Sequence, residues 1–88
     1  MFTKTLYATV IAGSTTDALA SVTKNVAKVD GFKVTGNVAL VSSMKLLYSV
    51  EILNTGGDVN DLWVVLTSYG ITPGNNLGSV WQTADALN

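Results

Sequence analysis

The stretch KTLYATVIAGSTTDA, residues 4–18, contains residue types that can hold a phosphate at the start of a helix. A strand, a glycine and a hydroxyl-rich turn before a helix present backbone amides that bind anions. The candidate anion or ligand residues are Gly13, Ser14 and Thr15. A phosphate loop of the Walker kind also needs an earlier glycine and a lysine, which this stretch lacks. Because Ser14 and Asp17 form a capping-box pattern that satisfies the same amides, the stretch favours an ordinary helix start.

The six acidic residues show no convergent pair that could act as a general acid and base. Asp17, Asp58 and Asp61 suit the first turns of helices, where negative charge is favourable. The cluster Asp58, Asn60, Asp61 has too few ligands for a calcium loop, and zinc lacks its usual ligands because histidine and cysteine are absent. Without histidine, the common nucleophilic triads have no base. We therefore expect no catalytic residue, no metal and no cofactor, and a protein that is not an enzyme.

Composition and charge are those of a small globular chain without a strong electrostatic field. The 88 residues predict a single domain, and 48% of them are hydrophobic while the net charge is -1. Such a chain has little attraction for nucleic acid or for an anionic membrane. No apolar run is long enough to cross a bilayer. Residues 1–20 make a weak signal peptide because Thr5 and Thr9 interrupt a short apolar run, so we expect a cytoplasmic protein.

The spacing of apolar residues predicts six elements. They are strands at 3–12, 32–40, 44–53 and 77–83, and helices at 15–29 and 59–69. Ser14 and Asp58 are the expected N-caps, and residues 73–76 (PGNN) are an expected loop. This order predicts an α+β, ferredoxin-like βαββαβ split arrangement, with an antiparallel four-stranded sheet and two helices on one face. The arrangement by itself names no function.

The register of the central hairpin is predicted from its apolar pattern. A three-residue loop, Val41–Ser43, pairs Leu40 with Met44 and directs the apolar residues of both strands inward. The same register places Lys33 opposite Glu51, which is a favourable cross-strand pair.

The sheet face away from the helices is the first candidate docking surface. It is rich in threonine, including Thr35, and Tyr7, Leu47 and Trp81 form a small apolar anchor on it. Protein interfaces favour Tyr and Trp in the centre and few charges. We expect a small non-enzymatic protein-binding or regulatory module, inhibitor-like or adaptor-like, that docks on a protein partner or on itself. Face-to-face pairing of two such sheets would form a symmetric homodimer.

The surface of the second helix is the other candidate docking surface. Trp63 lies on the flank of the apolar stripe, and Val64 lies almost opposite the stripe, where it is exposed. Either Trp63 packs under the edge of the sheet, or it extends an apolar patch with Val64.

A small-ligand or single-stranded nucleic-acid binding domain is the alternative function. The stretch LYATVI, residues 6–11, loosely resembles the first motif of RNA-recognition domains, which stack bases on sheet aromatics. The other stacking positions hold Leu47 and Ser49, which are not aromatic. Phosphate contacts normally supply most of the affinity, so the negative net charge argues against nucleic acid. A small ligand would bind near the loops at 13–16 and 73–76.

Overall fold

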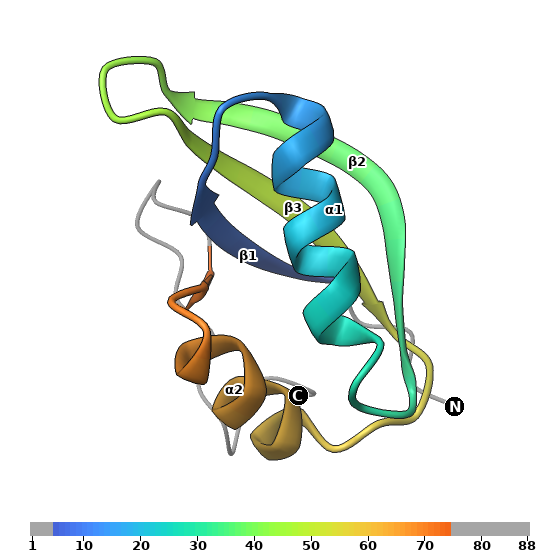
Figure 1. The fold of residues 1–88 in the computed structure, drawn as a ribbon. Coiled ribbons are helices and arrows are strands. Elements are labelled where there is room, and N and C mark those ends of the chain that lie inside the picture. The colour runs from blue at the N-terminus through green and yellow to red at the C-terminus, as the bar shows by residue number, and fades with distance from the viewer. Residues whose placement is uncertain (1–4, 75–88) are drawn as a thin grey trace.

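The computed structural model describes residues 5–74. This part of the chain is an α+β fold with a four-stranded antiparallel sheet and two helices (Figure 1). The elements follow in the order β1 (Thr5–Ile11), α1 (Thr15–Val26), β2 (Phe32–Ser42), β3 (Leu47–Asn54), α2 (Val59–Ser68) and β4 (Thr72–Pro73). The strands lie side by side as β2-β3-β1-β4, which puts β2 at one edge of the sheet.

Both helices begin at the N-caps expected from the sequence. The hydroxyl of Ser14 accepts a hydrogen bond of 3.1 Å from the backbone N–H of Asp17, and α1 follows. The carboxylate of Asp58 accepts one of 2.8 Å from the backbone N–H of Asn60 at the start of α2. Side-chain oxygens at these positions satisfy amides that have no partner inside the helix. Neither helix in the described range is long and apolar enough to cross a membrane.

A single core lies between the sheet and the two helices. Alternate residues of β1 and β3 point into it, and each helix contributes one apolar stripe. In Figure 1, α1 lies across one face of the sheet and α2 lies near β4. The buried hydrophobic residues are Leu6, Ala8, Val10, Ala18, Val22, Val26, Tyr48, Val50, Ile52, Val59, Leu62, Leu66 and Ile71.

The predicted register of the central hairpin is wrong. Leu40 pairs with Tyr48 instead of Met44, and Lys33 pairs with Leu53 instead of Glu51. The ladder shifts by two residues between Val34/Ile52 and Val38/Val50 and by one residue between Leu40/Tyr48 and Ser42/Leu47, and residues 43–46 form the turn. An even shift returns each side chain to the same face of the strand, so an alternating pattern does not reveal it.

The hairpin also extends beyond the core, which the sequence analysis did not anticipate. The 12 residues of α1 span about 18 Å, whereas the 11 residues of β2 span about 36 Å. A helix of that length covers only part of the strand. Met44 is therefore 96% exposed instead of inward-facing, and Leu40 and Leu46 are about half exposed. Figure 1 shows the β2–β3 hairpin extending past the N-terminal end of α1.

The end of the described chain differs from the expected loop at 73–76. Thr72 and Pro73 form the short strand β4, which pairs antiparallel with Thr9 and Ala8 of β1. Proline fits here because β4 is short and lies at the edge of the described sheet. The last strand expected at 77–83 lies outside the described residues, as does Trp81.

Candidate functional site on the outer face of the sheet

The outer face of the sheet, opposite the helices, changes character along its length. Three successive cross-strand pairs of β1 and β3 lie on it, because every second residue of a strand points to the same face. From one end to the other these pairs are Tyr7 with Glu51, Thr9 with Ser49, and Ile11 with Leu47. The first pair is polar, the second is small and the third is apolar.

The polar end is organised around the carboxylate of Glu51. The hydroxyl of Thr35 donates a hydrogen bond of 2.8 Å to Oε1, and the side-chain amide of Asn37 donates one of 3.0 Å to the same oxygen. The hydroxyl of Tyr7 donates to Oε2 at 3.4 Å. We call Tyr7, Thr35, Asn37 and Glu51 the Glu51 network. Thr35 and Asn37 both reach Glu51 because the irregularity in β2 falls between Val34 and Val38.

The electrostatics of the Glu51 network oppose a general-acid role for this carboxylate. The hydrogen bonds from Thr35 and Asn37, and a weaker one from Tyr7, hold the pKa of Glu51 below its usual value. Hydrogen bonds to the ionised form of a carboxylate stabilise that form. A general acid at neutral pH needs the opposite shift. Glu51 therefore remains charged, and its hydrogen bonds hold the irregular part of β2 against β3.

The centre of the outer face is less accessible than a solvated threonine-rich surface would be. Thr9 is 4% exposed and Ser49 is 7% exposed, although both were expected to face solvent. The hydroxyl of Thr9 donates to the backbone carbonyl of Thr72 at 3.4 Å. This small, buried pair separates the two ends of the face.

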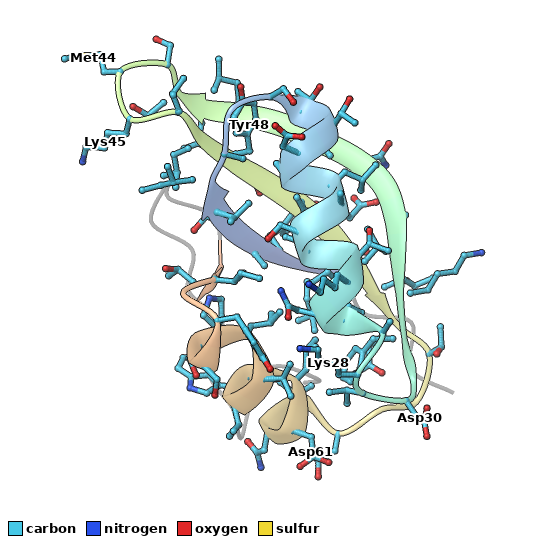
Figure 2. All side chains as sticks on the ribbon, in the orientation of Figure 1. Lys28, Asp30, Met44, Lys45, Tyr48 and Asp61 are labelled. Carbon is cyan, nitrogen blue, oxygen red and sulfur yellow. The ribbon has the colours of Figure 1, made fainter. Side chains whose placement is uncertain are left out.

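The apolar end combines the end of β1 with the turn of the hairpin. Ile11 is 70% exposed and pairs with the half-buried Leu47. The backbone N–H of Ala12 donates a hydrogen bond of 3.0 Å to the carbonyl of Leu46, which ties the turn to β1. We call Ile11, Met44, Leu46 and Leu47 the hairpin end. Figure 2 shows Met44 and the neighbouring lysine at the tip, pointing away from the rest of the molecule.

Leu46 has an unusual backbone conformation for its residue type. Its φ angle is 53°, and it is the one described residue other than glycine with a positive φ. The left-handed region costs an L-residue roughly 1–2 kcal/mol, and glycine or asparagine is the usual occupant. A leucine that is 48% exposed does not recover that cost by full burial in the core. Backbone outliers of this kind concentrate at functional sites, which makes Leu46 a candidate functional residue.

The residues predicted for protein docking are thus divided by the structure. Tyr7 and Thr35 belong to the Glu51 network, whereas Leu47 belongs to the hairpin end. The apolar pattern of the sequence placed Met44 and Leu46 in the core and did not identify Ile11 as part of the site. A signal that could have found them is length, because the predicted strands of the hairpin are much longer than the helix that covers them.

The helix start at 13–15 contains the N-cap of α1. Ser14 uses its hydroxyl to cap the amide of Asp17, as the capping-box interpretation predicted. A β-carbon added to Gly13 would lie 3.4 Å from a carboxylate oxygen of Asp17, so a negative charge stands beside this turn. An anionic ligand at Gly13, Ser14 or Thr15 would meet that charge.

The surface of α2 is divided between two open grooves. Val64 is 61% exposed, as expected, while Trp63 is half-buried and packs against the core. The groove beside Val64 has a volume of about 470 Å³, and its lining consists of Lys28, Val29, Asp30, Asp61, Val64 and Val65. The groove beside Trp63 has a volume of about 280 Å³, and its lining consists of Trp63, Thr67, Gly70, Ile71, Thr72 and Pro73. Val64 and Trp63 therefore line different grooves.

The groove beside Val64 adjoins a cation–π contact between the segment that follows α1 and the C-cap of α2. The ammonium of Lys28 lies 3.7 Å from the centroid of the Tyr69 ring. Its hydrogen bond and positive charge lower the pKa of the Tyr69 hydroxyl. Lys28 follows the C-terminal end of α1 and lines the same groove as Asp61 of α2 (Figure 2). Within residues 5–74, no group of three acidic, histidine or cysteine side chains is placed to hold a metal ion.

Comparisons with known proteins add no assignment. No protein-family model matches the chain, no curated protein matches it significantly, and no solved structure matches its fold significantly.

Proposed function

We propose that this protein is a small, non-enzymatic binding module that docks on a protein partner through its hairpin end. The module uses a ferredoxin-like arrangement as a rigid support for that end. The observation that carries the proposal is the left-handed backbone conformation of Leu46, whose side chain is half exposed. The other large apolar side chains of the hairpin end, Ile11 and Met44, are even more exposed than Leu46. Interfaces concentrate apolar anchors of this kind in a surface with few charges.

The hairpin end also indicates the chemistry of its partner. Between residues 34 and 50, Lys45 is the one charged residue, and it lies in the turn with Met44 and Leu46. A matching surface is an apolar hollow with an acidic group at its rim. The Glu51 network supports this choice of end, because its carboxylate already accepts three hydrogen bonds within the molecule.

The nucleic-acid alternative has less support. Tyr7, the expected stacking residue, donates its hydroxyl to the carboxylate of Glu51. An ionised carboxylate beside a stacking position repels the phosphates that normally supply affinity. The small-ligand version of the alternative, the regulatory role and the cytoplasmic location stay predictions.

Affinity capture with matched variants tests the proposal. The bait is the full chain, and the two variants are Ile11→Asp at the hairpin end and Val64→Asp on α2, since both residues are exposed aliphatic side chains. Losing the burial of one such side chain costs about 1.5–3 kcal/mol, so Ile11→Asp should reduce capture roughly tenfold or more. Val64→Asp should capture as much as the unmodified chain.

Two results would contradict the proposal. One is a set of captured proteins that is the same for Ile11→Asp and the unmodified chain. The other is material that disappears when the extract is treated with nuclease, because this would indicate a nucleic-acid partner. Circular dichroism of both variants controls for unfolding.

A further inference from the structure

The edge strand β2 carries a second surface that the proposed function does not use. The sheet order puts β2 at one edge, with β3 on its inner side (Figure 1). An edge strand presents a row of backbone N–H and C=O groups to which another strand can pair. The described chain places no strand on the outer side of β2. Of the hairpin end, Ile11 lies on β1, on the other side of β3, and Met44 and Leu46 lie in the turn that follows β2.

The two halves of β2 differ in how they resist pairing. The first half contains Lys33 and the irregularity between Val34 and Val38, and both features are known to protect sheet edges. The second half, Val38–Ser42, has the sequence VALVS and contains no charge, proline or glycine. Ala39 is exposed, and Leu40 is 51% exposed at the centre of the segment. The second half therefore lacks these protective features, and its backbone can pair with another strand.

We propose that Val38–Ser42 pairs antiparallel with the same segment of a second copy of this chain, with Leu40 on the twofold axis. A strand paired antiparallel with itself closes a dimer and leaves no further edge of that kind exposed. In this register Leu40 faces Leu40 of the second copy, so the most exposed large apolar side chain of the strand becomes buried. The two sheets then form one continuous sheet with the helices of both copies on the same side.

Charge favours a second copy as the occupant. The segment has no charged residue that would meet its own copy. In an antiparallel pair centred on Leu40, Val38 faces Ser42 of the second copy and Ala39 faces Val41, so no like charges meet across the interface.

Single-cysteine variants test this register directly, since the protein has no cysteine of its own. Facing residues of an antiparallel pair have Cα atoms about 4.5–5.5 Å apart, which suits a disulfide. Leu40→Cys should therefore form a covalent dimer under mild oxidation. Met44→Cys is the matched control: its side chain is more exposed, but in this register it lies on the order of 20 Å from its own copy.

Sedimentation equilibrium of the unmodified chain and of Leu40→Lys completes the test. The unmodified chain should be dimeric. Leu40→Lys should raise the dissociation constant roughly tenfold or more, because two ammonium groups would face each other and the Leu40 burial would be lost. Its melting curve shows whether it folds.

Three results would overturn the proposal. They are a monomeric unmodified chain at every concentration, a dimer that Leu40→Lys does not weaken, and a Met44→Cys disulfide that forms as fast as the Leu40→Cys one. None of them bears on the hairpin end, which is tested by Ile11→Asp and partner capture.

Discussion

Both ends of the outer face contain residues of β1 and β3, but the two ends differ in how many contacts their side chains make within the molecule. At the polar end, the carboxylate of Glu51 accepts hydrogen bonds from three side chains of the same molecule. At the hairpin end, Ile11 and Met44 remain 70% and 96% exposed. A carboxylate whose hydrogen bonds are made within the molecule has a role in the fold. Exposed apolar side chains that gather at one place are typical of a binding surface.

The backbone shows the same contrast. Each end contains a residue with a positive φ, and at the polar end it is Gly36, with φ of 94°. Glycine adopts that conformation without steric cost. At the hairpin end it is Leu46, with φ of 53°, which a leucine adopts only with strain. At the polar end, the residue with the positive φ is thus of a type that adopts this conformation without strain. At the hairpin end it is not.

The substitution Gly36→Val should cause the largest loss of stability among the changes that break this contrast. A β-carbon at Gly36 would meet no atom within 4 Å, so the cost comes from the positive φ and not from a clash. We expect the free energy of unfolding to fall by about 1–3 kcal/mol, measured by urea denaturation. Ala39→Val, in the extended part of the same strand, is the control and should change stability little. Equal losses in both variants would contradict the role assigned to Gly36.

The substitution Glu51→Gln should have a smaller effect that depends on pH. The pKa of Glu51 is lower in the folded protein than the value of about 4.3 expected in the unfolded chain. Its ionised form therefore stabilises the fold above that unfolded value, and the contribution is lost as the pH falls through the folded pKa. Melting temperatures of the two proteins should differ most near neutral pH and converge in acid. A difference that does not change with pH would contradict the role assigned to the Glu51 network.

Local signals in the sequence were sufficient for the two helices and the first three strands, but not for β4. Ser14 and Asp58 cap the helices where their side-chain chemistry predicts, and Tyr48, Val50 and Ile52 alternate into the core as their spacing predicts. These features depend on interactions between residues a few positions apart, or on a period of two along one strand.

The register of the hairpin and the candidate site depend on longer-range structure. The irregularity around Gly36 shifts β2 by two residues, and an even shift keeps the faces of Val34 and Val38 unchanged, so the sequence pattern could not reveal it. Whether Met44 and Leu46 are buried depends on how far α1 reaches along the sheet. The apolar pattern alone placed both residues inside.

The most direct test of the central claim is partner capture by Leu46→Asn, measured together with its melting temperature. Asparagine tolerates the left-handed region, so the free energy of unfolding should stay unchanged or rise by up to about 1 kcal/mol. The backbone carbonyl that bonds Ala12 remains. We expect capture to be lost while the fold is at least as stable as before. Full capture by a stable Leu46→Asn variant would contradict the proposal that the hairpin end is the docking surface.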